Sequence, residues 1–452
     1  MRVLLIQPHS SSDLMDRVYL FEPLALEYLG AGARQDGHEV RILDARIDRD
    51  TDGAIRSFHP DVVGLTGFTS HLNIIKGIAA QAKGIDPEIT VIVGGHHATV
   101  SPGDFNDPSI DFVVIGEGVA TLRELLAVVA GNMDLRQVRG VAVPSPGGLL
   151  LNTPRPYTPL DELPLPDRTL TAGYRKSYFS EWFKPLASIR TSLGCTARCS
   201  FCALWSITDG KYLRREPERV VRELAEIAEE NVFFCDDESM CDTRRMEELA
   251  ELIEQAGIRK NYFLYARVDT IVRHPELFAR WRRIGLSQVF VGMEDFSDPR
   301  LQAMNKGVTV AQQEEAVRIL DRLGIMMYAS FMVDPDYNNE DFAALRAYIG
   351  KLKLKYATFT VMTPLPGTAL HASVKGRLLS SKPELFDMLH ALVPTRLPLE
   401  EFYREMATLY AKAIPLHRAL PTLLKFGLHG MVLRMKLFGA FLKRLQHFHL
   451  EY

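Results

Sequence analysis

The sequence predicts an α/β protein with an N-terminal doubly wound domain, a partial (β/α)6 barrel and an α-helical C-terminal extension. The chain has 452 residues, which is more than one hydrophobic core usually serves. Short apolar runs alternate with helical patterns along most of it. After the Pro-Leu-Pro-Gly stretch at residues 364–367 only helical patterns remain. We place the parts at residues 1–135, 136–184, 185–370 and 371–452, with the second part a linker.

Short apolar runs in the first part predict parallel strands at residues 3–6, 39–43, 62–66, 90–93 and 112–115. The last three runs are followed by turn residues, which are Gly67, Gly94, Gly95, Gly116, Glu117 and Gly118. In doubly wound sheets ligands bind outside the carboxyl ends of the strands, where glycine lets them approach the backbone. These glycines are equally well explained as ordinary tight turns. No Gly-x-Gly-x-x-Gly opens the first helix, which disfavours a nucleotide-binding Rossmann domain.

The second part is rich in proline and glycine between residues 144 and 167, as expected of a linker. Beyond it we predict strands at residues 186–191, 232–235, 262–268, 288–291, 326–333 and 357–362. Helices are predicted between them at residues 220–229, 244–256, 310–323 and 342–352. Six strands are too few for an eight-fold barrel and fit an open six-fold barrel.

Composition narrows the class of protein. The formal net charge is only -3, so nothing global indicates a nucleic-acid partner. The chain has five cysteines, and the close grouping of three of them favours metal binding over a disulfide framework. Such thiols indicate a reducing cytoplasm. No apolar run reaches the roughly 18 residues that a membrane-spanning helix needs. We therefore expect a cytoplasmic protein that is soluble or peripheral to a membrane.

Three cysteines form the strongest motif in the chain. Cys195, Cys199 and Cys202 directly follow the predicted strand 186–191 with the spacing C-x3-C-x2-C. Three thiolates can hold three irons of a cubane cluster and leave the fourth iron open. Zinc is disfavoured because no second cysteine pair or His-x3-5-His pattern lies nearby. Cys235 and Cys241 are better explained as buried thiols, although a role for Cys235 near the substrate stays open.

With Phe201 as the aromatic residue before the last cysteine, the motif resembles the signature of the radical S-adenosylmethionine (SAM) family. The resemblance implies a 4Fe-4S cluster on the three cysteines and SAM on the open iron. It also implies SAM contacts from Phe201, Asp236, Arg267, Gly292 and Glu294, with Glu294 receiving the amino group of SAM. Any one such carboxylate or arginine is as often a helix cap or an ion-pair partner. The sequence departs from its relatives at residues 329–335, which lack the glycines of Gly-x-Ile-x-Gly-x-Pro.

The first domain resembles the cobalamin-binding module that precedes many barrels of this family. The resembling stretches are residues 3–8, 23–29, 37–40, 64–67, 94–99 and 116–118. The resemblance implies cobalamin contacts from Gly67, Gly94, Gly95, His97, Gly116, Glu117 and Gly118. No Asp-x-His-x-x-Gly occurs in this domain, so we expect cobalt to lack a lower histidine ligand. His97 is expected to orient its loop, because a lone histidine in a glycine turn is weak evidence for a metal ligand.

The resemblance covers nearly the whole chain, and residues 363–368 and 392–403 are similar to the members of the family that methylate hopanoids at C-3. It implies that an electron from the cluster cleaves SAM, that the resulting 5'-deoxyadenosyl radical abstracts hydrogen from an unreactive carbon, and that this carbon takes a methyl group from methylcobalamin. The implied partners are a small-molecule or lipid substrate and an electron donor such as flavodoxin or ferredoxin. Ring cyclisation or rearrangement with the same cofactors is the alternative, followed by a non-catalytic cobalamin or iron-sulfur sensor. No catalytic side chain is assigned.

The C-terminal extension is basic, because no acidic residue lies between Glu405 and Glu451. Apolar residues recur near helical spacing from Pro421 onward, with lysine and arginine among them. A helix of this kind can lie in the headgroup region of an anionic membrane. A helix docked on the barrel with a solvated basic face is slightly favoured by the residues alone. The resemblance to hopanoid-methylating proteins favours peripheral contact with the inner face of the membrane.

Overall fold

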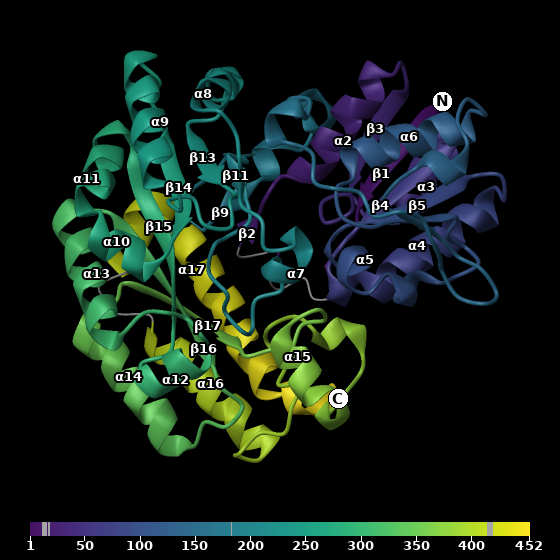
Figure 1. Ribbon diagram of the computed structural model, residues 1–452. Helices are drawn as coiled ribbons and strands as arrows, with labels where there is room; N and C mark the ends of the chain where they lie inside the picture. The colour runs from purple at the N-terminus through teal and green to yellow at the C-terminus, as the bar shows by residue number, and fades with distance from the viewer. Residues whose placement is uncertain (11–15, 17–18, 182, 414–418) are drawn as a thin grey trace. The chain divides into compact units, whose positions relative to one another are not determined.

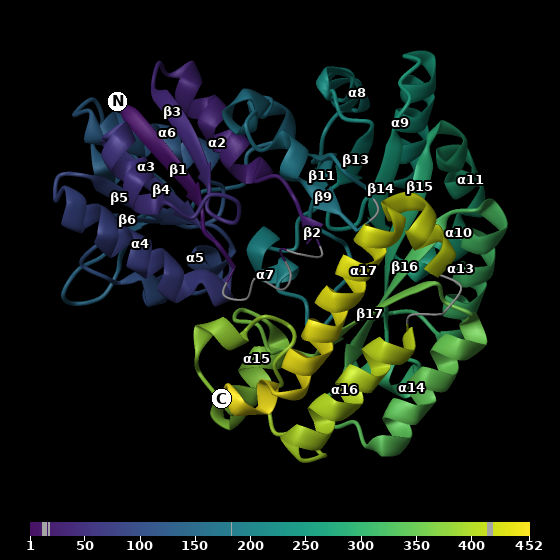
Figure 2. The same cartoon turned by 180° about the vertical axis from the view of Figure 1, so that it is seen from behind.

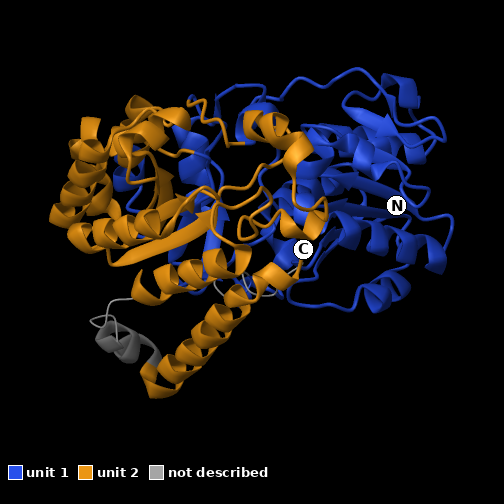
Figure 3. Cartoon of the chain, turned by 90° about the horizontal axis from the view of Figure 1, so that it is seen from below, with its two compact units in different colours: residues 1–196, 203–237, 251–260 blue, residues 197–202, 238–250, 261–452 orange. Residues whose placement is uncertain are grey.

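The computed structural model describes residues 1–10, 16, 19–181, 183–413 and 419–452. The chain forms two compact units, shown in separate colours in Figure 3. Unit 1 contains residues 1–196, 203–237 and 251–260, and unit 2 contains residues 197–202, 238–250 and 261–452.

Unit 1 begins with a seven-stranded sheet in the order β3-β1-β4-β5-β6-β7-β8 (Figure 1). The pairs from β3 to β6 are parallel, and β7 and β8 are antiparallel. The strands are β1 (Arg2–Gln7), β3 (Glu39–Asp44), β4 (Val62–Thr66), β5 (Thr90–Gly94), β6 (Phe112–Val114), β7 (Val141–Val143) and β8 (Leu150–Leu151). The helices are α2 (Leu24–Gln35), α3 (Thr51–Phe58), α4 (Leu72–Ile85), α5 (His96–Val100) and α6 (Val119–Val129).

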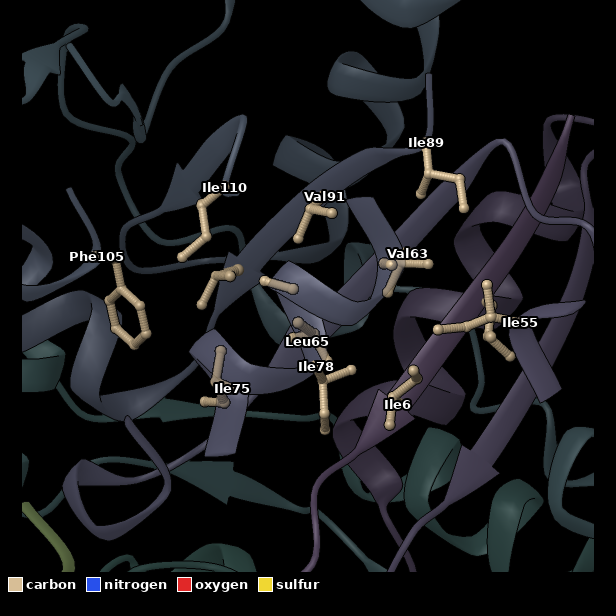
Figure 4. Close-up of a cluster of buried hydrophobic side chains, with 14 of the residues drawn as sticks. Ile6, Ile55, Val63, Leu65, Ile75, Ile78, Ile89, Val91, Phe105 and Ile110 are labelled. Atoms are coloured by element: carbon tan, nitrogen blue, oxygen red, sulfur yellow. The ribbon is translucent and has the colours of Figure 1, made fainter. Parts of the chain in front are cut away.

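Both faces of this sheet are buried. Leu4 and Ile6 of β1 pack in one hydrophobic cluster with α3 and α4, part of which is drawn in Figure 4. Val3 and Leu5 pack in a second cluster with α2 and α6. Successive side chains of a strand point to opposite faces, so a strand buried on both sides must be apolar at every position. This explains the continuous run Val-Leu-Leu-Ile and confirms the doubly wound arrangement.

The five predicted strands of this sheet are present, with ends that differ by one residue at most. Strands β7 and β8 were not predicted, because both fall within residues 136–184, which we interpreted as a linker. β7 pairs with β6 through Ala142 and Val141, and both residues are buried. A strand of three residues is too short to show the alternation of apolar and polar residues that identifies a strand in a sequence. Whether such a segment forms a strand therefore depends on tertiary packing. The division of the chain at residues 135, 184 and 370 stays a prediction.

The rest of unit 1 contains the first two strands predicted for the barrel. β10 (Leu186–Ile189) pairs in parallel with β13 (Asn231–Phe234). Two short antiparallel ladders join β2 (Tyr19–Leu20) to β9 (Phe179–Ser180), and β11 (Ser192–Leu193) to β12 (Leu213–Arg214). The helices here are α7 (Leu204–Thr208) and α8 (Pro217–Glu226). α9 (Thr243–Gln255) follows β13 and belongs to both units.

Unit 2 contains four parallel strands, β14 (Asn261–Ala266), β15 (Leu286–Glu294), β16 (Met326–Val333) and β17 (Tyr356–Val361). Between them lie α10 (Val268–Arg273), α11 (Pro275–Ile284), α12 (Asp298–Ala303), α13 (Val310–Leu323) and α14 (Asn339–Leu352). Local signals fix helix ends: Thr309 and Gln312 form a capping box that begins α13, and Gly324, with a φ of 64°, ends it. The six strands predicted for the barrel, β10 and β13 to β17, are thus present. Helices α10, α11 and α12 were not predicted.

After β17 unit 2 continues as helices, namely α15 (Ala369–Val374), α16 (Leu399–Ala413) and α17 (Ala419–Gln446), seen in yellow-green and yellow in Figure 2. The predicted helical extension is therefore present. α17 packs against α16 and is kinked at Gly427. Residues 421–426 belong to the predicted amphipathic tail, but the structure does not describe their side chains. None of the described helices combines the length and apolar character needed to cross a membrane.

Candidate functional site

The glycine turns of unit 1 follow three neighbouring strands, β4, β5 and β6, at their carboxyl ends. Gly95 has a φ of 99°, which a residue with a side chain rarely adopts. A Cβ atom at Gly95 would lie 2.5 Å from Thr66 Oγ1 and 2.9 Å from Gly67 N. The loops after β4 and β5 therefore approach each other closely, and glycine is required there. Gly94 is less restricted, since its nearest neighbour would be Val114 at 3.5 Å.

His97 is buried beside these turns, and both of its ring nitrogens face protein groups. Nδ1 lies 3.1 Å from Thr69 Oγ1, and Nε2 lies 3.1 Å from Asp104 Oδ2. The ring also packs edge-on against Phe105. Burial lowers the pKa of His97, and Asp104 opposes that shift. This arrangement connects the loops after β4 and β5, in keeping with an orienting role.

Glu117 follows β6, and its carboxylate accepts hydrogen bonds from the backbone of the protein. Its Oε1 accepts a hydrogen bond from Val119 N at 2.5 Å, and its Oε2 accepts one from Ala120 N at 3.1 Å. These bonds satisfy free N–H groups at the start of α6. Gly116 has a φ of 83°, and a Cβ atom there would meet nothing within 4 Å, whereas one at Gly118 would meet Leu29 at 3.4 Å. Backbone at Gly116 therefore borders open space at this edge.

An aromatic pair at the same edge escaped the sequence analysis. Phe68 directly follows Gly67, and its side chain is 55% exposed. The ring of His96, which is also exposed, packs against it at a centroid distance of 4.7 Å. The Phe68 N–H donates to His71 Nδ1 at 3.1 Å, which fixes the loop. An exposed aromatic ring beside glycine backbone suits a large flat ligand held by shape, and an exposed phenylalanine in a turn gives no pattern that would have shown it.

Two acidic residues after β13 hold the chain that leads to Cys195. Asp236 Oδ1 accepts hydrogen bonds from Thr191 N at 2.6 Å and Ser192 N at 2.8 Å, and its Oδ2 accepts one from Thr191 Oγ1. Asp237 Oδ2 accepts from Gly194 N at 2.8 Å. Both oxygens of Asp236, a predicted SAM contact, are thus engaged with backbone and hydroxyl groups that precede the cysteine loop.

Cys235 lies at the end of β13 in unit 1. Its Sγ donates to the Ile189 carbonyl at 3.3 Å, and it packs against Leu24, Tyr28 and Val119. Burial raises the pKa of the thiol to about 12, so it stays protonated at neutral pH. This is the environment of an unreactive thiol. Cys241, in unit 2, is partly exposed, and its N–H donates to the Glu238 carbonyl at 3.4 Å.

The remainder of the cysteine loop lies in unit 2. Cys199 and Cys202 are partly exposed, and Cys202 N donates to the Cys199 carbonyl, which places Phe201 inside a tight turn. The Arg267 Nη1 lies 4.0 Å from Cys199 Sγ. Its Nε donates to Asp269 Oδ1 at 2.9 Å, and this ion pair fixes the guanidinium. The guanidinium thus lies beside the sulfur of one predicted cluster ligand. Among the described residues no three possible ligands are grouped closely enough to hold a metal ion, so the cluster on the three cysteines stays a prediction.

A β-bulge shapes the end of β15. The register with β16 shifts between Gly292 and Glu294, and Glu294 has a φ of 63°. Bulges of this kind redirect a side chain beside functional sites. Glu294 Oε1 accepts a hydrogen bond from Lys306 Nζ at 2.5 Å, and both side chains are about nine-tenths buried. A Cβ atom at Gly292 would lie 2.3 Å from Glu294 Oε1 and 2.9 Å from Lys306 Nζ, so only glycine leaves room for this pair.

Comparison with known proteins covers both halves of the chain. The family model described as B12 binding domain matches residues 14–126, and the model described as Radical SAM superfamily matches residues 189–349. The hopanoid C-3 methylase of Methylococcus capsulatus is 32% identical over 93% of this chain and 83% of its own length. The anaerobic magnesium-protoporphyrin IX monomethyl ester cyclase of Rubrivivax gelatinosus is 28% identical over 74% of this chain and 62% of its own.

A solved structure shares the fold. The radical SAM methyltransferase TsrM from Kitasatospora setae, with cobalamin and a [4Fe-4S] cluster bound, superposes with a TM-score of 0.72. The match covers 92% of this chain and 90% of TsrM at 18% sequence identity. At that identity the likeness concerns the fold.

Proposed function

This chain belongs to the cobalamin-dependent radical SAM methyltransferases, and we propose that it methylates an unactivated carbon of a hopanoid-type lipid, at C-3. The cofactors of this family are a 4Fe-4S cluster, SAM and cobalamin, which together supply a carbon-centred radical and a methyl group. The observation that carries the proposal is the 32% identity to a hopanoid C-3 methylase over 93% of this chain and 83% of that protein. A match over 93% of this chain reaches into the helical extension as well as both cofactor domains.

Within this proposal, Cys195, Cys199 and Cys202 hold the cluster. Arg267 lies beside one of these ligands, with its Nη1 4.0 Å from Cys199 Sγ. Gly292 and Glu294 form the SAM side of the site, and Asp236 shapes the loop that carries Cys195. In unit 1 the turns at Gly67, Gly95 and Gly116 offer backbone to cobalamin, and Phe68 offers it an aromatic face.

The surface of α17 supports a lipid substrate. Leu428, Val432 and Met435 are exposed and follow i, i+4, i+7 spacing, so they share one face of the helix. The exposed residues Lys436 and Lys443 lie beside that face. Apolar residues bordered by lysines match the interface of an anionic bilayer. We propose that this face rests on the membrane from which the substrate is collected.

Product mass tests the reaction. Reconstituted enzyme is incubated without oxygen with SAM, methylcobalamin, a reductant and a hopanoid-containing lipid extract. The expected product is heavier than the hopanoid by one methylene unit and carries it at C-3. A product formed without that gain would favour ring chemistry of the kind named for the cyclase relatives. If the enzyme cleaves SAM but no hopanoid is modified, the proposed hopanoid substrate would be wrong, whereas the assignment to the radical SAM family would stand.

Sedimentation with vesicles tests the membrane contact separately. The protein is expected to sediment with phosphatidylglycerol vesicles at low salt and less at high salt, because exposed charges are screened. The double substitution of Leu428→Ser and Met435→Ser should remove the binding. Leu151→Ser, on the exposed edge strand β8, is the control for loss of an apolar surface residue. Equal sedimentation of wild type and the double variant would reject the contact.

A further inference from the structure

We propose that a cationic face of unit 2, formed by Arg198, Lys375 and Arg377, docks an acidic electron-transfer protein beside the cysteine loop. The proposal rests on the cluster assigned to that loop and adds the place where its electron enters. Its evidence is a contact between distant parts of the chain, the charge of those parts and the exposure of their cations.

The chain after β17 lies directly beside the cysteine loop. Leu370 N, in α15, donates to the Ser200 carbonyl at 3.2 Å. Ser200 stands between Cys199 and Cys202, so this hydrogen bond joins α15 to the backbone between two predicted cluster ligands. Ser200 N in turn donates to the Met304 carbonyl at 3.0 Å. The cysteine loop, the segment after α12 and α15 are therefore held together.

The stretches that meet at this point carry no negative charge. Residues 195–208, 299–313 and 342–383 contain no aspartate or glutamate, although the whole chain has 56 acidic and 53 basic residues. Acidic side chains are thus common in this protein and absent from all three stretches. The electrostatic field that these stretches add around the cysteine loop is positive.

Three cations of these stretches reach solvent. Arg198 is exposed within the cysteine loop, and Lys375 and Arg377 are exposed in η7 (Lys375–Arg377), the short helix that directly follows α15. The side chains of Lys375 and Arg377 form no hydrogen bond or ion pair with any other residue that the structure describes. Their charges are therefore not neutralised locally and can attract the carboxylates of an approaching protein.

The position of the face indicates which kind of anion it meets. The exposed residues of α15 are Ala369, Ala372 and Ser373, so this helix has no large apolar side chain to insert into a bilayer. A protein that brings an electron must approach the cluster closely, and the cationic face adjoins the loop of the predicted cluster ligands. Electron-transfer complexes are small and transient, so a few charges are enough to orient the partner. The partner is oxidised by one electron and the cluster is reduced by one, with no bond made or broken.

Binding of a flavodoxin, an acidic electron-transfer protein, tests the face directly. The Kd of oxidised flavodoxin for the holoenzyme is measured by calorimetry at low and high salt. For the double variant Lys375→Gln and Arg377→Gln we expect the Kd at low salt to rise about 3- to 10-fold, because two exposed charge pairs are lost. The difference should shrink at high salt, where exposed charges are screened.

The control is the double variant Arg282→Gln and Arg283→Gln, which removes the same charge from two exposed residues of α11. These arginines stand at the amino end of β15, whereas α15 follows the carboxyl end of β17. The control should leave the Kd of flavodoxin unchanged. An equal rise of the Kd in both double variants would overturn the proposal, because any surface cation would then attract the partner.

SAM cleavage with two reductants separates docking from chemistry. With reduced flavodoxin below saturation, the variant with Lys375→Gln and Arg377→Gln should cleave SAM about 3- to 10-fold more slowly than wild type. With dithionite, a small reductant that needs no docking surface, the two proteins should cleave SAM at the same rate. If the double variant does not fold, each single variant is measured and the same direction is expected.

Three other results would overturn the proposal. One is an unchanged Kd of flavodoxin in the variant with Lys375→Gln and Arg377→Gln. Another is loss of sedimentation with phosphatidylglycerol vesicles in that variant while flavodoxin still binds, which would make the face a membrane contact. The third is failure of wild type to bind either flavodoxin or a [2Fe–2S] ferredoxin. Failure of dithionite to drive SAM cleavage in wild type would instead reject the cluster and the proposed function, since binding of flavodoxin is measured without turnover.

Discussion

The carboxyl edges of the strands in the two units are built alike but present different surfaces. In unit 1 the ionisable residues of the edge are used internally: His97 faces Thr69 and Asp104, and Glu117 caps α6. What remains is glycine backbone and the exposed rings of Phe68 and His96. In unit 2 the edge keeps an ion pair, Glu294 with Lys306. The carboxyl end of a parallel strand is thus a place where a ligand can bind. The residues that follow the strand decide whether this place presents an uncharged surface, as in unit 1, or charged side chains, as in unit 2.

The largest expected effect comes from substitutions in the cysteine loop, which should abolish SAM cleavage and leave cobalamin binding in unit 1 intact. Changing any one of Cys195, Cys199 or Cys202 to Ala should abolish SAM cleavage, because three thiolates are needed to hold the cluster. Cobalamin content should remain near wild type. Iron content and 5'-deoxyadenosine formation are the measurements, and Cys235→Ala, at the buried thiol, is the control. An intact cubane cluster in these variants would show that other ligands hold it.

The next effect concerns the glycine edge of unit 1. Gly95→Ala places a Cβ atom 2.5 Å from Thr66 Oγ1 at a φ of 99°, so the loops after β4 and β5 must separate. We expect cobalamin affinity to fall roughly tenfold or more, as strain of this kind costs about 1–3 kcal/mol. Gly77→Ala in α4, where a Cβ atom meets nothing within 4 Å, is the control. Unchanged cobalamin content in Gly95→Ala would mean that this loop does not hold the cofactor.

Buried carboxylates should respond to pH in the same direction at the two edges, because burial raises the pKa of both Glu238 and Glu117. Burial raises the pKa of Glu238 in unit 2 to about 7, so the folded protein holds its proton more tightly than the unfolded chain does. The stability from this proton is present below the unfolded pKa of about 4.5 and is lost as the pH rises through 7. Relative to wild type, Glu238→Gln should therefore gain on the order of 2–3 kcal/mol between pH 5 and pH 8.

Glu117→Gln in unit 1 should likewise gain stability relative to wild type between pH 5 and pH 8, because burial raises the pKa of Glu117. The gain is offset by the loss of one of the two hydrogen bonds that the carboxylate accepts at the start of α6. Urea denaturation at pH 5 and pH 8 measures both variants. A stability difference from wild type that is the same at pH 5 and pH 8 would contradict the raised pKa of the residue replaced.

The smallest expected effect is none at all. Replacing His97 with Gln should leave the spectrum of bound cobalamin unchanged, because the buried ring faces protein groups, with Nδ1 3.1 Å from Thr69 Oγ1 and Nε2 3.1 Å from Asp104 Oδ2. Paramagnetic resonance of the Co(II) form should show no histidine coupling in either protein. Coupling that disappears in His97→Gln would make His97 a ligand and reverse our account of the unit 1 edge.

The sequence by itself determined the fold class, the order of the parts and the cysteine loop. Each depends on a local or periodic signal: buried parallel strands read as continuous apolar runs such as residues 3–6, and C-x3-C-x2-C is a contiguous motif. The family followed from that motif and from the turns after β4, β5 and β6.

Only the tertiary structure decided which of the indicated residues remain available to a ligand. Asp236, His97 and Glu117 lie at the expected strand ends, yet their polar atoms are engaged with groups of the protein. Lys306 carries no sequence signal and reaches Glu294 because a bulge turns β15 and the segment after α12 docks on the cysteine loop. β7 and β8 exist because β6 offers an edge to pair with. Such contacts join residues that are distant in the chain. The free energy of burying or pairing these residues depends on their three-dimensional neighbours, so the spacing of residues along the sequence cannot predict it.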